Sequence, residues 1–133
     1  MALATMKDFR ELKVWHKAHE LTLLVYRTTR SFPREELYGI TAQMRRASAS
    51  IPANLAEGCG RIGNPELARF CVIAMGSAND LEYHILLAKD LSLVDSKEHL
   101  ELTRRTTEVK RMLTALWKKL RCPPVRETQL ADH

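Results

Sequence analysis

Apolar residues recur along this chain at alternating spacings of three and four residues, which is the spacing of an amphipathic helix. The pattern predicts four helices, over about residues 11–31, 35–59, 65–91 and 96–121. No segment alternates apolar and polar residues as a half-buried strand would. We therefore predict a single all-α domain over residues 1–133, folded as an antiparallel up-down-up-down four-helix bundle.

One apolar stripe on each helix is predicted to face a shared core. Aromatic residues are few, so this core is expected to be mostly aliphatic. The predicted inward-facing residues, in chain order, are Val14, Ala18, Leu21, Val25, Thr28 and Phe32; Leu37, Ile40, Met44, Ala47, Ile51 and Leu55; Leu67, Phe70, Ala74, Ser77, Leu81, Ile85, Ala88 and Leu91; and Leu102, Thr106, Val109, Leu113, Leu116 and Leu120.

Polar residues mark the predicted starts of three helices. Asp8 with Glu11, and Asp95 with Glu98, have the spacing of a capping box, in which two side chains bind the first backbone amides of a helix. Asn64 is expected to cap the third helix through its side chain.

Prolines mark an irregularity in the second helix and the end of the fourth. Pro52 removes a backbone donor and clashes with the carbonyl four residues earlier, so we expect a kink near Ala49 or, as the alternative, a break into two helices. The tail from Pro123 to His133 is expected to be disordered.

The charge balance favours anionic partners. The chain carries 21 Lys and Arg against 16 Asp and Glu, a net charge of +5. Such a charge suits RNA, DNA or an acidic protein, although many basic proteins use it only for solubility.

Cysteine usage and the absence of long apolar runs indicate the compartment. Three cysteines without a C-x-x-C pair favour neither a disulfide framework nor a zinc ribbon, so a cytoplasmic location is expected. No apolar run approaches the roughly 18 residues of a membrane-spanning helix, so no membrane partner is expected. The sequence leaves open whether the chain starts at Met1 or at Met6.

No pattern of catalytic or ligand-binding residues stands out, so neither enzyme activity nor a cofactor nor a metal is expected. The Glu-x-x-His spacing of di-metal bundles is absent, and His16 and His19 are more simply explained as solvated side chains. The segment Glu57-Gly-Cys-Gly-Arg61 lacks the spacing of a phosphate-binding P-loop. Cys71 lies beside the third apolar stripe and is expected to be a buried apolar side chain rather than a reactive thiol.

A row of polar residues follows one face of the second predicted helix. Such a row can be a solvated surface, a buried hydrogen-bonded network or a subunit interface. If it is buried, its charged members need partners, for which the third helix offers Ser77, Asp80 and Glu82. The row itself consists of Gln43, Arg46, Ser50, Asn54, Glu57 and Arg61. Our hypothesis is a structural network of Gln43, Arg46, Ser50, Asn54, Glu57, Ser77 and Glu82.

Basic residues recur every seven positions along the last predicted helix. Arg104, Arg111 and Lys118 lie on the side opposite its apolar stripe, so they are expected to face outward. Such a stripe can follow a phosphate backbone, and the alternative is an ordinary solvated face. With Arg45 on the second helix, these three residues are the predicted nucleic-acid contacts.

Five segments of the chain occur in a combination that is typical of one family. They are Glu11-Leu-Lys-Val-Trp15-His-Lys-Ala18, Phe32-Pro33, Tyr38-Gly39, Gln43-Met-Arg-Arg-Ala47-Ser-Ala-Ser50-Ile-Pro-Ala-Asn54-Leu-Ala-Glu57-Gly58 and Ala74-Met-Gly-Ser77-Ala-Asn-Asp-Leu-Glu82. In these segments the chain resembles the 23S rRNA intervening-sequence protein family of bacterial four-helix bundles. The resemblance extends from about Phe9 to Leu120.

The resemblance implies a homopentamer of four-helix bundles, often encoded within insertions in large ribosomal RNA genes and without known enzymatic activity. It also implies a relation in fold to the accessory variability determinant proteins of diversity-generating retroelements, which bind nucleic acid and a reverse transcriptase through basic surfaces. We therefore expect a non-enzymatic, oligomeric protein associated with RNA or DNA. The alternatives are a protein interaction scaffold without nucleic-acid affinity and, more remotely, a metal-dependent bundle enzyme.

Overall fold

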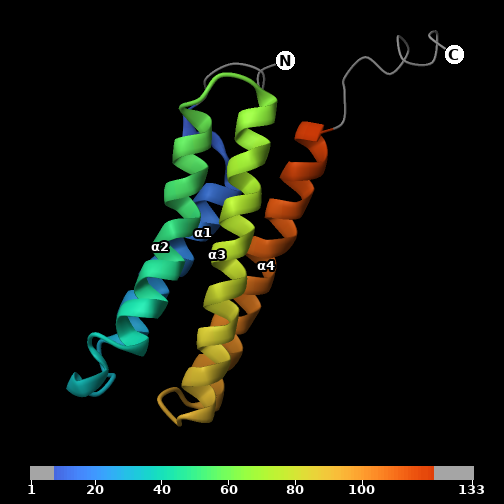
Figure 1. The fold of residues 1–133 in the computed structure, drawn as a ribbon. Helices are drawn as coiled ribbons and strands as arrows, with labels where there is room; N and C mark the ends of the chain where they lie inside the picture. The colour runs from blue at the N-terminus through green and yellow to red at the C-terminus, as the bar shows by residue number, and fades with distance from the viewer. Residues whose placement is uncertain (1–7, 122–133) are drawn as a thin grey trace, which may run out of the picture.

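The computed structural model describes residues 8–121, and these residues form a bundle of four helices (Figure 1). The helices are α1 (Lys13–Thr29), α2 (Ile40–Cys59), α3 (Asn64–Asp90) and α4 (Ser96–Arg121). Two short 3₁₀ helices, η2 (Phe9–Glu11) and η3 (Arg34–Glu36), precede α1 and α2. Residues 8–121 contain no strand, so the prediction of an all-α four-helix bundle is confirmed.

The helices pack in a closed ring in which α1 contacts α2, α2 contacts α3, α3 contacts α4, and α4 contacts α1. In Figure 1, α2 and α4 run from the lower end of the molecule to the upper end, and α3 runs back between them. Because short connections join the helices, sequence neighbours are also neighbours in space.

The core is formed by the apolar stripes that the sequence indicated. Leu21, Met44, Ile51, Leu81 and Leu113 are fully buried at its centre. Two predicted core residues, Leu37 and Leu91, are exposed instead. Both lie outside the helices, since α2 begins at Ile40 and α3 ends at Asp90, so neither continues the buried stripe of its helix.

Helix starts agree with the sequence where a side chain caps the helix and disagree elsewhere. At α4 the predicted capping box is confirmed, since the Glu98 amide donates to Asp95 Oδ1 at 2.7 Å and the Asp95 amide donates to Glu98 Oε1 at 2.9 Å. The box at Asp8 is wrong, because Asp8 accepts from Arg10 and caps η2 rather than α1. Asn64 is not a cap either, because it is the first residue of α3 and Gly63 precedes the helix with a φ of 97°.

The second helix begins later than predicted, at Ile40 rather than near residue 35. Residues 34–36 form a separate 3₁₀ turn, and Gly39 has a φ of −104° and a ψ of −117°, outside the helical region. The connection between α1 and α2 therefore consists of a 3₁₀ turn followed by a non-helical residue, Gly39, rather than the first turn of α2.

Pro52 lies inside α2, and the helix continues through it, so the predicted alternative of two separate helices is wrong. The kink near Ala49 stays a prediction. Because proline has no backbone N–H, the carbonyl of Ser48 loses its partner within the helix. Thr22 of α1 fills that position, since its buried hydroxyl donates to the Ser48 oxygen at 2.9 Å and shares its proton with the Ala18 oxygen at 3.0 Å.

None of the described helices combines the length and the apolar character that crossing a membrane requires. The predictions for the start of the chain and for the tail from Pro123 to His133 concern residues outside the described range.

Candidate nucleic-acid interface

The basic stripe of α4 faces outward, as its spacing indicated. Arg104, Arg111 and Lys118 are all exposed, whereas Leu102 and Val109 on the opposite side of the helix are buried. Intervals of seven residues return a side chain to nearly the same face of a helix, which explains why the three basic residues form one line.

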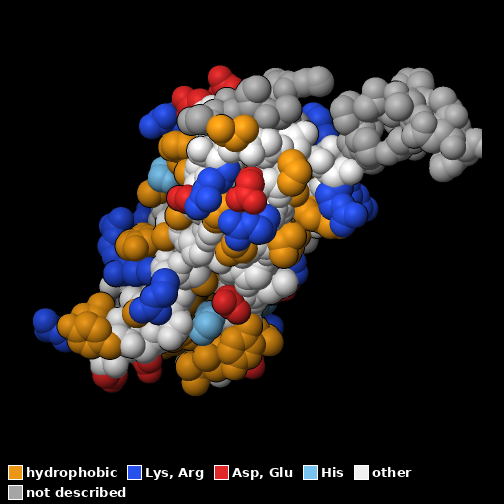
Figure 2. Space-filling model, turned by 45° about the horizontal axis from the view of Figure 1, so that its top comes forward, with side chains coloured by type: hydrophobic (Ala, Val, Ile, Leu, Met, Phe, Trp, Pro, Cys, Tyr) orange, Lys and Arg blue, Asp and Glu red, His pale blue; other side chains and the backbone are white. Residues whose placement is uncertain are grey.

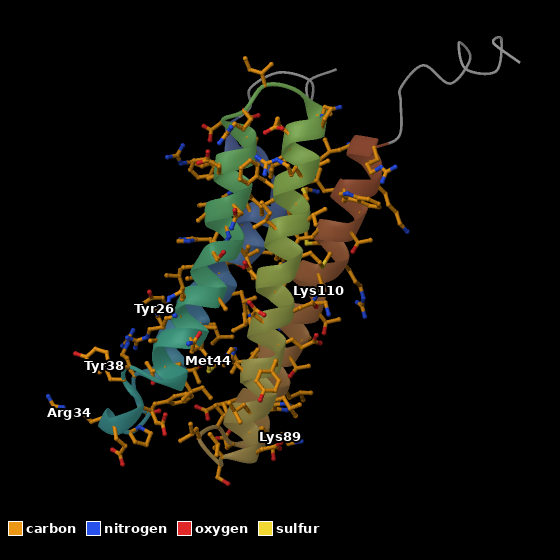
Figure 3. All side chains as sticks on the ribbon, viewed as in Figure 1. Tyr26, Arg34, Tyr38, Met44, Lys89 and Lys110 are labelled. Carbon is orange, nitrogen blue, oxygen red and sulfur yellow. The ribbon has the colours of Figure 1, made fainter. Side chains whose placement is uncertain are left out.

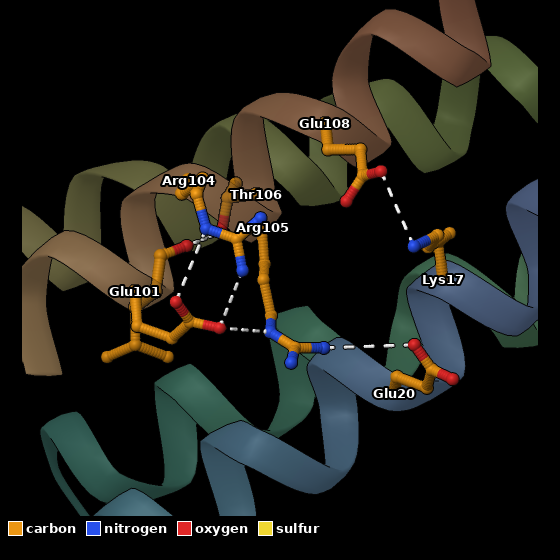
Figure 4. Close-up of polar contacts among 8 residues, drawn as sticks. Lys17, Glu20, Glu101, Arg104, Arg105, Thr106 and Glu108 are labelled. Carbon is orange, nitrogen blue, oxygen red and sulfur yellow. Dashed lines mark hydrogen bonds and ion pairs between the residues drawn. The ribbon is translucent and has the colours of Figure 1, made fainter.

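The first residue of the stripe is bound to an acidic neighbour (Figure 4). Arg104 donates to both oxygens of Glu101, at 3.3 and 2.8 Å, and Arg105 donates to the same carboxylate. The hydrogen bonds from Arg104 and Arg105 lower the pKa of the Glu101 carboxyl, and the hydrogen bond to Glu101 raises the pKa of Arg104. Much of the charge of Arg104 is therefore balanced within the protein.

Other ion pairs join α4 to its neighbours at the same level of the bundle. Glu108 lies 3.4 Å from Lys17 of α1, and Arg105 lies 3.7 Å from Glu20 of α1, as Figure 4 shows. On the other side of α4, Lys110 lies 2.8 Å from Glu82 of α3. Exposed pairs of this kind contribute about 0–1 kcal/mol each, so they orient α4 more than they stabilise it.

The end of α4 is different, because no acidic residue follows Glu108 within the helix. Arg111, Lys118 and Lys119 are exposed and have no ion pair within residues 8–121. The Arg121 guanidinium lies over the Trp117 ring at 4.8 Å from its centre. We call Arg111, Lys118, Lys119 and Arg121 the terminal basic segment. In Figure 2, Lys and Arg side chains gather at the right, beside the end of α4.

Arg45 is not part of this surface in a single chain. It projects from α2 toward α1, where its Nε donates to Thr29 Oγ1 at 2.9 Å and its guanidinium lies 4.7 Å from the centre of the Tyr26 ring. The structure therefore brings Arg45 together with residues of α1 and not with Arg104, Arg111 and Lys118.

The polar row of α2 is divided between a half-buried centre and exposed ends. At the centre, Ser50 and Ser77 of α3 are hydrogen bonded at 2.7 Å, and Asn54 Nδ2 donates to Ser50 Oγ at 2.9 Å. This cluster joins α2 to α3. At one end Arg46 is exposed and its described partner is Gln43, whose Oε1 lies 3.5 Å away.

The other end of the row is an exposed ion-pair chain. Glu57 pairs with Arg61 at 3.0 Å, and Arg61 also lies 4.0 Å from Glu66 of α3. Glu82, which we assigned to the network, lies elsewhere and pairs with Lys110 of α4. The assignment of Glu82 to the network is therefore wrong, because its side chain extends to the α3–α4 side of the bundle.

Side chains with other chemistry are buried, stacked or already bound. Burial, and secondly the nearby Cys59, raises the pKa of the Cys71 thiol to about 12, so this thiol stays protonated at neutral pH. His16 Nε2 lies 2.7 Å from the Arg10 carbonyl oxygen, and His19 stacks on Trp15. Within residues 8–121 no three His, Cys, Asp or Glu side chains lie close enough together to hold a metal ion.

Two basic residues escaped the sequence analysis. Arg30 and Arg34 lie close to Arg45 around one hollow, between the end of α1 and the start of α2. The signal in the sequence was the run from Thr28 to Arg34, in which hydroxyl and basic residues interrupt the apolar pattern.

The fold and these surfaces define an all-α, four-helix-bundle protein with charged outer faces. Residues 10–115 match the family model of the 23S rRNA-intervening sequence protein. The chain therefore belongs to that family, which confirms the resemblance seen in its sequence. The relation to accessory variability determinant proteins stays an expectation.

A solved structure shares the fold. It is the crystal structure of a protein with unknown function from the S23 ribosomal protein family of Bacteroides thetaiotaomicron VPI-5482. The two chains are 20% identical with a TM-score of 0.71, over 79% of this chain and 98% of that one. No curated protein matches the chain.

Proposed function

We propose that this protein is a non-enzymatic, cytoplasmic accessory protein that binds the phosphate backbone of RNA through the terminal basic segment of α4. The observation that carries the proposal is the charge distribution on α4, where the acidic residues end at Glu108. From Arg111 onward, the exposed cations of the helix form no ion pair within the described residues. Cations that are not balanced within the protein can release counterions from a nucleic acid. Membership of a family named for a ribosomal RNA insertion supports RNA as the partner.

We further propose that the protein works as a homo-oligomer, with the pentamer implied by its family as the expected form. An apolar line on the outer face of α3 supports association. Val72, Tyr83 and Leu86 are 56%, 57% and 49% exposed and lie on one face of α3, on which Gly76 and Asn79 separate Val72 from Tyr83. Exposed apolar residues in such a line are typical of interaction surfaces.

The test of RNA binding is fluorescence anisotropy with structured RNA, single-stranded RNA and duplex DNA across a series of salt concentrations. The slope of log affinity against log salt is about −0.7 per phosphate contact for single strands and about −0.9 for duplex DNA. We expect Arg111→Gln and Lys118→Gln each to lower the magnitude of this slope by roughly one contact.

Arg104→Gln is the matched control, since it removes one charge from the same face of the same helix. Because Arg104 is already bound to Glu101, its replacement is expected to change the slope much less. An unchanged slope in a variant that combines Arg111→Gln with Lys118→Gln contradicts the proposal.

The apolar line on α3 also favours a second candidate function, a scaffold that binds another protein and has no affinity for nucleic acid. Sedimentation of Tyr83→Glu and Leu86→Glu variants separates the two uses of this face. Dissociation of an oligomer to monomers identifies the face as a contact between copies. An unchanged assembly together with absent RNA binding favours the scaffold.

A further inference from the structure

A solvent-open hollow of about 390 Å³ lies where α1 ends and α2 begins. This volume falls in the range of roughly 300–1,000 Å³ that is typical of small-ligand sites. Its lining includes Arg30, Arg34, Arg45, Thr29 and Thr41. Figure 3 shows Arg34 with Tyr26 and Tyr38 at this same end of the molecule, away from Lys110 of α4.

The charge in the hollow is positive and unbalanced. Arg30, Arg34 and Arg45 line it, no acidic residue does, and none of the three arginines forms an ion pair within residues 8–121. Arg45 donates from its Nε to Thr29 and lies over the Tyr26 ring, which holds the guanidinium in place. Its two terminal nitrogens have no hydrogen-bond partner in the described part of the chain. Glu36 lies beside Gly39 at the start of α2 but not in the lining.

A buried hydroxyl group in the same hollow is unpaired. Thr41 is only 3% exposed, and its Oγ1 has no hydrogen-bond partner in the described structure. Buried polar atoms in folded proteins almost always have a partner, so the Thr41 hydroxyl, in a residue that lines the hollow, is a donor that a bound anion can pair with.

The first turn of α2 also favours binding of an anion. Thr41 is the second residue of α2, a helix of 20 residues whose preceding residue, Gly39, offers no side chain to cap it. The first amides of a helix have no acceptor within the helix, and this end carries a partial positive charge that attracts anions.

We propose that this hollow binds the terminal phosphate of a nucleotide unit. Arg30, Arg34 and Arg45 balance its charge, and Thr41 donates its hydroxyl proton to a phosphate oxygen. Three guanidinium groups suit a phosphate monoester, which carries a charge of about −1.5 to −2 at pH 7, better than a singly charged diester. Tyr38 lies outside the lining but at the same end of the molecule (Figure 3), and because it is 92% exposed its ring is open to stack with the attached base.

The first measurement is calorimetric titration with inorganic phosphate and with nucleoside 5′-monophosphates, at constant ionic strength in chloride. We expect saturable binding that weakens roughly tenfold or more in Arg34→Gln, the loss of a charged hydrogen bond. Thr41→Val, which keeps the shape of the side chain, is expected to weaken binding while the protein stays folded. Arg27→Gln is the control, since Arg27 is an exposed arginine of α1 outside the lining of the hollow, and this variant should bind phosphate as the unaltered protein does.

The second measurement compares one oligoribonucleotide with and without a 5′-phosphate. A preference for the phosphorylated end that Arg34→Gln removes supports the proposal, with an RNA end as the source of the phosphate. Binding of nucleoside monophosphates without an end preference supports it with a small nucleotide as the source. Absence of saturable binding, or full binding in a protein carrying both Arg34→Gln and Thr41→Val, overturns it.

The hollow and the terminal basic segment can fail separately. Because the hollow belongs to α1 and α2, variants of Arg34 and Thr41 should leave the salt dependence of binding through α4 intact when the RNA has no 5′-phosphate. Absence of saturable phosphate binding by the unaltered protein, together with a salt slope that Arg111→Gln and Lys118→Gln still lower, therefore counts against the hollow alone.

Discussion

Gly58, in the last turn of α2, lies where α2 and α3 approach so closely that a methyl group does not fit. A Cβ atom at this position would lie 2.8 Å from both Leu67 Cδ1 and Phe70 Cβ, and 3.4 Å from Leu67 Cα. Carbon atoms in good contact are about 3.5–4.0 Å apart, so Gly58→Ala forces α3 to move or its side chains to shift. The Phe70 Cβ cannot give way without its backbone.

Two opposing effects set the change in the free energy of unfolding that Gly58→Ala causes. Overpacking a well-packed core costs about 1–3 kcal/mol, whereas alanine gains at most about 1 kcal/mol over glycine in helix propensity. We therefore expect Gly58→Ala to lower the free energy of unfolding by up to about 2 kcal/mol. For a chain of this size each kcal/mol shifts the melting temperature by roughly 3–5 °C.

Gly76 in α3 provides the matched control, because a Cβ added there meets nothing within 4 Å. Gly76→Ala should raise stability by about 0.4–1 kcal/mol, since alanine restricts the unfolded chain and favours the helix. Thermal and urea unfolding followed by far-ultraviolet circular dichroism measure both variants, with size-exclusion chromatography to compare their assembly. Stabilisation of equal size in the two variants would refute the close approach of α2 and α3 at Gly58.

Two further predictions concern the half-buried polar cluster and the buried thiol. Asn54→Leu removes the hydrogen bond to Ser50 and should destabilise the protein by about 1 kcal/mol in urea unfolding, whereas Gln43→Leu at the exposed end should change stability by less than about 0.5 kcal/mol. Equal effects of the two would argue against a cluster that stabilises the α2–α3 contact. Because the folded state raises the pKa of Cys71 from 9.0 to about 12, stability should fall as the pH rises through that interval. Iodoacetamide with peptide mass spectrometry should find Cys71 protected at pH 9 in the folded protein. Equal alkylation of folded and urea-unfolded protein would contradict this.

The sequence allowed the helices and their buried faces to be predicted, because both depend on local spacing. Leu21 and Leu113 are buried as their stripes require. The errors lie at helix ends, where a polar residue alone does not reveal whether its side chain caps the helix. Asn64 illustrates this, since it enters α3 as a helical residue and its Oδ1 stays unpaired within the described residues.

The candidate sites were harder to predict because they depend on which helices face each other. The outward direction of Lys118 follows from spacing within α4 alone. The pairing of Glu82 with Lys110, by contrast, requires the α3–α4 register, and the hollow that joins Arg30, Arg34 and Arg45 requires the shape of the α1–α2 connection. The spacing of apolar residues within one helix predicts neither the register between two helices nor the shape of the connection that joins them.

The bond between Thr22 and the carbonyl that Pro52 leaves unpaired has a consequence for the alignment of two helices. Helices in contact through apolar side chains alone can slip past each other by one turn, about 5.4 Å. Here such a slip would leave the buried Ser48 carbonyl without a hydrogen-bond donor. The proline therefore fixes the register of α1 along α2. Since the arginine hollow is built from both helices, its shape is set in part by this distant bond. Among related chains, Thr22 and Pro52 are expected to be exchanged together.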